Sequence, residues 1–150
     1  MTARSIAITL LLSLLSSCGP TIVEPTQVVV EVTSDLGEAL AQVDTALFDA
    51  REQQASDTQS YALPAEVALP FTFAIVPAPQ RPANTVLVVV TGRDAQGALL
   101  AQAKALVSFR DNRRTFLTMS LLSACLQREC GLLQTCTVSQ SNVASCTTVE

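Results

Sequence analysis

Apolar and polar residues alternate along several short stretches of this chain, which is the pattern of strands that bury one face. Val28, Val30 and Val32 fall on one side of such a stretch, and Glu31 and Thr33 fall on the other. The same period of two recurs further along the chain. It predicts six strands, at residues 27–33, 40–49, 69–76, 84–92, 98–109 and 114–121.

Turn residues separate the predicted strands. The sequence Asp-Ala-Gln-Gly at 94–97 places glycine where a tight turn favours it, so the strands on either side are expected to form a hairpin. Asp111 and Asn112 indicate a second turn. Residues 51–60 are polar and without periodicity, and they are predicted to form a loop.

Residues 36–50 fit two structures. Leu36, Leu40, Val43 and Leu47 follow helical spacing, and alanine in this segment favours a helix. Val43, Thr45 and Leu47 also alternate with polar neighbours, as they would in a strand. We predict a strand here and keep the helix as the open alternative.

Short strands separated by turns, with no long helices between them, are typical of an antiparallel β-sandwich. Over residues 26–122 this strand rhythm, with the 91–97 turn, resembles immunoglobulin-like and fibronectin-III-like domains. The chain has no tryptophan and so lacks the Cys-Trp-Cys core of antibody domains. The resemblance therefore implies an all-β sandwich of about six to seven strands.

The N-terminus has the layout of a signal peptide. Arg4 precedes ten uncharged residues, 6–15, and polar residues follow at once. A membrane-spanning helix needs about twenty apolar residues, so this segment is too short to be one. Residues 1–17 are predicted to direct export and to be removed.

The residues at the end of this leader, Leu15-Ser16-Ser17-Cys18, resemble the bacterial lipobox. The resemblance implies that the chain is cleaved before Cys18, that lipid is attached to its thiol, and that residues 18–25 form a tether with two prolines. Gly19 follows the cysteine where an aspartate would signal retention in the inner membrane, so the resemblance favours location in the outer membrane. In a host with a single membrane, the same motif would place the protein on the outer face of that membrane. An ordinary secretory leader with a chance cysteine is the alternative.

The C-terminal residues 123–150 form a cysteine-rich tail with few large apolar side chains. In an exported chain its four cysteines are expected to form two disulfides, because the spacing is poor for a zinc site and no histidine is present. Three pairings are open. The tail resembles short growth-factor-like knots, which implies the interlocked order. In that order Cys125 pairs with Cys136, and Cys130 pairs with Cys146.

Composition excludes several functions. Without the leader the chain has eight basic and thirteen acidic residues, and the Arg113-Arg114 pair is expected to be a solvated turn, so nucleic acid is not an expected partner. The absence of histidine removes the usual general base and the commonest metal ligand. Lys104 and Ser108 would share a strand face, but Lys104 is expected to be solvated.

The remaining chemistry is sparse. Asp44, Asp94 and Asp111 are expected to be turn and surface residues, and the five glycines form no phosphate loop. We therefore expect no enzyme activity, cofactor or metal. The expected function is that of a lipid-anchored cell-envelope module that contacts a protein or envelope partner. A sugar-binding module is the alternative, although such sites usually present aromatic platforms and this chain has few aromatic residues.

Overall fold

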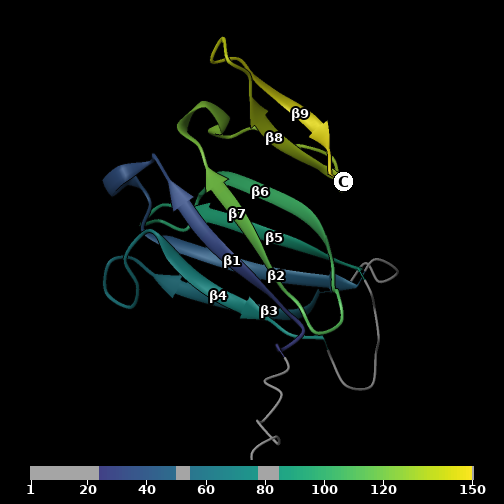
Figure 1. Cartoon of the computed structure of the whole chain (residues 1–150). Coiled ribbons are helices and arrows are strands. Elements are labelled where there is room, and N and C mark those ends of the chain that lie inside the picture. The colour runs from purple at the N-terminus through teal and green to yellow at the C-terminus, as the bar shows by residue number, and fades with distance from the viewer. Residues whose placement is uncertain (1–23, 50–54, 78–84, 150) are drawn as a thin grey trace, which may run out of the picture.

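Two β-sheets stacked face to face make up the larger part of the structure (Figure 1). The computed structural model describes residues 24–49, 55–77 and 85–149, so the leader and Cys18 lie outside the described residues. The predicted all-β sandwich is confirmed. The smaller sheet contains, in spatial order, β4 (Phe71–Ile75), β1 (Gln27–Ser34) and β7 (Arg114–Leu121). The larger contains β3 (Ala55–Ala62), β2 (Gln42–Asp49), β5 (Thr85–Arg93) and β6 (Leu99–Ser108).

The smaller sheet is mixed, whereas the larger one is antiparallel throughout. β1 lies in the centre of the smaller sheet and pairs antiparallel with β4 and parallel with β7. Gln27 is the partner of Arg114, and Ser34 is the partner of Leu121. The first and last strands of the sandwich therefore start at one end of the molecule and finish at the other.

The core lies between the two sheets and is mostly aliphatic. The predicted alternation in the first strand is confirmed, because Val28, Val30 and Val32 are fully buried. They belong to one apolar cluster with Val88 and Val90 of the opposite sheet. Side chains from both sheets thus interdigitate, as in other sandwiches.

β5 is buried on both of its faces. Val88 and Val90 point into the core between the sheets, while Leu87 and Val89 belong to a second buried cluster on the outer side of the larger sheet. This explains why its sequence is a continuous valine run and not an alternation. The second cluster includes Val149, which comes from the C-terminal tail.

The predicted loop at 51–60 is wrong for residues 55–60, and residues 51–54 lie outside the described structure. Residues 55–62 form β3, the outermost strand of the larger sheet, paired with β2. Most of β3 is exposed to water on both faces, so its residues are polar without alternation. Period-two analysis cannot detect such a strand.

Within the described residues 36–49, residues 42–49 form a strand, as predicted, and no α-helix is present. The helical content of these residues is limited to the single 3-10 turn η2 (Gly37–Ala39), after which β2 begins at Gln42. Gly37 has a φ of 59°, a conformation that glycine adopts without steric cost. The helical spacing of the leucines therefore comes from a turn followed by a strand.

Both predicted turns are present. The Asp94 carboxylate accepts hydrogen bonds from the backbone N–H groups of Gln96 (2.9 Å) and Ala98 (2.8 Å), and it so closes the β5–β6 hairpin. Asn112 has a φ of 54° between β6 and β7. Asparagine tolerates this left-handed conformation better than most residues.

The tail has a secondary structure that the sequence did not predict. After the 3-10 turn η3 (Ser123–Cys125), the strands β8 (Gln134–Val138) and β9 (Ala144–Thr148) form a two-stranded antiparallel hairpin. Both strands are short and carry mostly small polar residues. Alternation of large apolar residues, the usual signal, is absent from them.

Leu121 provides a test of the core. It is among the largest fully buried side chains, and its substitution by alanine leaves a cavity beside Gly92. We expect Leu121→Ala to lower the free energy of unfolding by about 2–5 kcal/mol in urea titrations with the disulfides intact. Leu132→Ala, at a site 66% exposed, should change it by less than about 0.5 kcal/mol. Equal effects of the two substitutions would contradict the assignment of the core.

Candidate interaction surfaces

Two interlocked disulfides hold the tail together. Cys125 is bonded to Cys136, and Cys130 is bonded to Cys146, which confirms the predicted pairing. Cys136 and Cys146 are direct partners in the β8–β9 ladder. Because each of them is bonded to the segment before the hairpin, both strands are tied to that segment separately.

The tail lies along the free edge of β6. The backbone N–H of Lys104 donates to the hydroxyl of Thr135 at 3.0 Å, and the N–H of Gln127 donates to the carbonyl of Leu100 at 2.8 Å. An uncovered edge strand is a template for pairing with other chains. The tail therefore covers the β6 edge of the larger sheet, which is the edge opposite β3.

The side chain of Lys104 fastens the tail, and the expectation that it is solvated is wrong. Its ammonium group donates to the carbonyls of Cys130 (3.1 Å) and Gly131 (2.9 Å). Burial lowers the pKa of Lys104. The hydroxyl of Ser108 instead forms a hydrogen bond with the hydroxyl of Thr85, at 2.9 Å. The two residues thus have separate structural partners and do not form a Ser-Lys pair.

Apolar contacts complete the docking of the tail. Val149, which follows β9, is 7% exposed and clusters with Leu87 and Val89 on the outer side of β5. Its N–H donates to the carbonyl of Leu133 at 3.0 Å, which fixes the end of the chain against the tail itself. Cys125, at the start of the tail, is 2% exposed.

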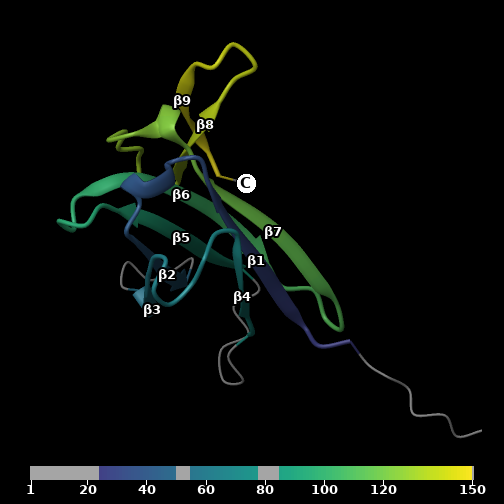
Figure 2. The same cartoon turned by 90° about the vertical axis from the view of Figure 1, so that its left-hand side faces the viewer.

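The tail also carries several large hydrophobic side chains that are exposed to water. Four of the six large hydrophobic residues that are exposed in the described structure belong to this short segment. We call these residues the tail patch: Leu126, Leu132, Leu133 and Val143. In Figure 2 the β8–β9 hairpin projects away from the two sheets, with its turn outermost.

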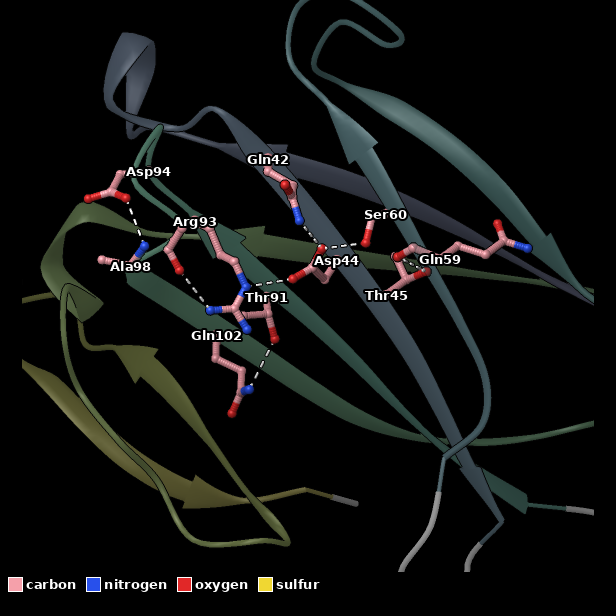
Figure 3. Close-up of polar contacts among 11 residues, drawn as sticks. Gln42, Asp44, Thr45, Gln59, Ser60, Thr91, Arg93, Asp94, Ala98 and Gln102 are labelled. Carbon is pink, nitrogen blue, oxygen red and sulfur yellow. Dashed lines mark hydrogen bonds and ion pairs between the residues drawn. The ribbon is translucent and has the colours of Figure 1, made fainter.

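The larger sheet also carries a polar cluster on its outer face (Figure 3). The Asp44 carboxylate accepts hydrogen bonds from Gln42 (2.6 Å), Ser60 (2.7 Å) and the guanidinium of Arg93 (2.6 Å). Arg93 also donates to the carbonyl of Gly97 at 3.0 Å. Every second side chain of a strand points to the same face of its sheet. Side chains from β2, β3 and β5 therefore come together in this cluster.

The electrostatics of Asp44 make it a poor acid or base. Its partial burial alone would raise the pKa, but hydrogen bonds from Gln42, Arg93 and Ser60, together with the charge of Arg93, outweigh that effect and lower the pKa of Asp44. The carboxylate is ionised at neutral pH and its oxygens already accept three hydrogen bonds. The cluster therefore ties strands together and offers no group poised for proton transfer.

The sequence-predicted residues have mixed outcomes. The four tail cysteines are brought together as expected, Asp111 is exposed in the β6–β7 turn, and Asp94 is half-buried at the β5–β6 turn. Arg113 and Arg114 are exposed at the β6–β7 turn, as predicted. The prediction that Asp44 is a turn residue is wrong, because it lies within strand β2 and pairs with Arg93. The role of Lys104 was also missed, and both roles depend on residues that are distant in the chain.

Neither a metal site nor a membrane-spanning helix emerges from the described structure. Within residues 24–49, 55–77 and 85–149, His, Cys, Asp and Glu nowhere gather in threes in a way that could hold a metal ion. In those same ranges no helix is long and apolar enough to cross a membrane. The chain matches no family model, and no curated protein or solved structure was found to be similar to it.

The docking of the tail can be tested at Val149. Val149→Ala removes buried apolar surface while both disulfides stay in place, so the tail should loosen without unfolding the sandwich. We expect hydrogen exchange at the Lys104 amide to accelerate about tenfold, because its acceptor Thr135 belongs to the tail. Val143→Ala, at a site 61% exposed, should leave this amide unchanged. Unaltered exchange in both variants would show that Val149 does not hold the tail.

The Asp44–Arg93 pair should stabilise the fold in a pH-dependent way. The pKa of folded Asp44 is lowered, so the stabilisation is complete above the pKa of an unfolded aspartate, about 3.9, and is lost as pH falls through the lower folded value. Both side chains are partly exposed, 25% and 37%, so we expect a coupling of about 1 kcal/mol or less at pH 7. A double-mutant cycle of Asp44→Asn and Arg93→Gln, measured by urea unfolding at pH 7 and below pH 3, checks this. A coupling that persists in acid would contradict it.

Proposed function

We propose that this protein is exported, is anchored to the cell envelope by lipid on Cys18, and serves there as a non-enzymatic interaction module. The observation that carries the proposal is the sequence Leu15-Ser16-Ser17-Cys18 at the end of a short apolar leader. Outer-membrane location is part of the proposal, because Gly19 follows the cysteine.

The disulfides support export. Every cysteine in the described structure, Cys125, Cys130, Cys136 and Cys146, is in a disulfide. Disulfides persist in oxidising compartments outside the cytoplasm. A small tail that depends on two such bonds is suited to the envelope.

The parallel pairing of β1 and β7 supports a particular orientation. The attachment point of the tether, at the start of β1, lies beside Arg114, and the tail begins after Leu121 at the opposite end of β7. Eight strand residues span roughly 25 Å. Figure 1 shows the tail at the far end of the sandwich from the point where β1 begins. Lipid on Cys18 would therefore point the tail away from the membrane.

The tail patch favours a protein partner. Large apolar side chains that stay exposed are typical of surfaces that contact other proteins, and here four of them lie in the cross-linked tail. Sugar sites instead use aromatic platforms. The chain has five phenylalanines and one tyrosine, and of these only Phe116, which lies outside the tail, is strongly exposed. The contact surface proposed for the module is accordingly the tail patch.

Lipidation is tested by labelling cells with radioactive palmitate. The full chain should incorporate label and fractionate with membranes, and Cys18→Ser should lose both properties, because only the thiol forms the thioether. Ser16→Ala keeps a small side chain in the motif and should be labelled like the wild type. Equal labelling of Cys18→Ser would refute the lipid anchor.

A further inference from the structure

An open hollow lies where β6 ends and β7 begins. It has a volume of about 510 Å³, and its lining runs from Leu106 to Leu117 around the turn. Three of the lining residues are arginines, and no acidic residue of the described structure lines the hollow. The three arginines are Arg110, Arg113 and Arg114.

This concentration of positive charge is unusual for the chain. The whole sequence has a net charge of −4 and only nine basic residues, so a third of them line one hollow. Glu24, Asp49 and Asp111 are found at the same end of the sandwich, but none of them lines the hollow. The hollow therefore presents a local positive surface on an acidic protein, which suits an anionic ligand.

An exposed aromatic side chain adjoins the arginines. Phe116 lines the same hollow and is 72% exposed. In the smaller sheet it pairs with Val29, and Val76, 63% exposed, follows β4 at this same end. Arginines beside exposed apolar groups match the interface of a bilayer, where phosphates and acyl chains lie within a few ångströms of each other.

The tether emerges at this hollow. The N–H of Gln27 donates to the carbonyl of Arg113 at 3.2 Å, and the N–H of Asn112 donates to the hydroxyl of Thr26 at 2.8 Å. Residues 18–25 precede this point, and eight residues reach at most about 28 Å when fully extended. A lipid on Cys18 would hold the hollow within that distance of the membrane.

We propose that this hollow binds the phosphates of anionic lipid headgroups and that Phe116 enters the interfacial layer of the same bilayer. The proposal rests on the lipid anchor proposed above, which brings the hollow to the membrane. Guanidinium groups form paired hydrogen bonds with phosphate oxygens, so Arg110, Arg113 and Arg114 provide the matching donors. The domain would then lie on the bilayer by this end, with its tail facing outward.

Tryptophan fluorescence tests the proposal, because the chain contains no tryptophan of its own. Full-length Phe116→Trp, purified from membranes, is reconstituted into vesicles of phosphatidylcholine alone or with 30% phosphatidylglycerol. We expect a blue-shifted emission and protection from a water-soluble quencher only with phosphatidylglycerol, reversed in 0.5 M salt. Val143→Trp, at the far end of the molecule, should show neither effect.

Charge substitutions in the Phe116→Trp protein test the arginines. Each basic residue near an anionic surface favours the bound state about fivefold, so Arg113→Gln should reduce the ratio of protected to exposed tryptophan by about that factor. Substituting all three arginines should abolish the protection. The matched control is Arg128→Gln, which removes a charge from the tail and should have no effect.

The outcomes separate this proposal from the lipid anchor. Palmitate labelling of the same preparations reports on Cys18 independently of the fluorescence. Protection that requires both phosphatidylglycerol and the arginines supports the lipid site, whether or not Cys18 carries palmitate. Labelled protein that shows no protection, or shows it equally in both vesicle types or in the triple variant, overturns the lipid site while the anchor stands.

Discussion

The structure depends on keeping β5 away from water on both sides. Its inward valines are covered by the smaller sheet, as in any sandwich, but Leu87 and Val89 face outward and need a second cover. The C-terminal tail supplies that cover through Val149. The tail is therefore part of the fold and not an appendage, because without it an apolar strip of the larger sheet would be exposed.

The tail can serve as this cover only because it is cross-linked. Its hairpin carries few buried apolar side chains, and two-stranded hairpins are marginal by themselves in water. The bonds Cys125–Cys136 and Cys130–Cys146 remove much of the freedom of the unfolded segment. Lys104 of β6 then holds the cross-linked tail in place through hydrogen bonds to two tail carbonyls. The tail thus covers both the apolar outer face of β5 and the open edge of β6.

The same arrangement gives the molecule two unlike ends. The parallel pairing of β1 with β7 places the incoming chain beside the β6–β7 turn, and the outgoing chain leaves from the opposite end toward the tail. Arginines and Phe116 gather at the first end, and the tail patch lies at the second. A module held at the envelope by its N-terminus would thus present different chemistry to the membrane and to its surroundings.

The sequence by itself determined the local features of this protein: the alternating strands such as β1, the turn residues Asp94 and Asn112, and the presence of two disulfides. The strands and turns depend on neighbours within a few residues, and the disulfides were predicted from four cysteines gathered in one short exported segment. Only the tertiary structure decided the rest. β3 is a strand because β2 offers it a partner, and Lys104 is an anchor because residues 130 and 131 fold back onto it. Likewise the Asp44–Arg93 pair joins residues 49 positions apart. Such contacts form when separate strands are brought into register, and no local pattern of residue types records which strands will meet.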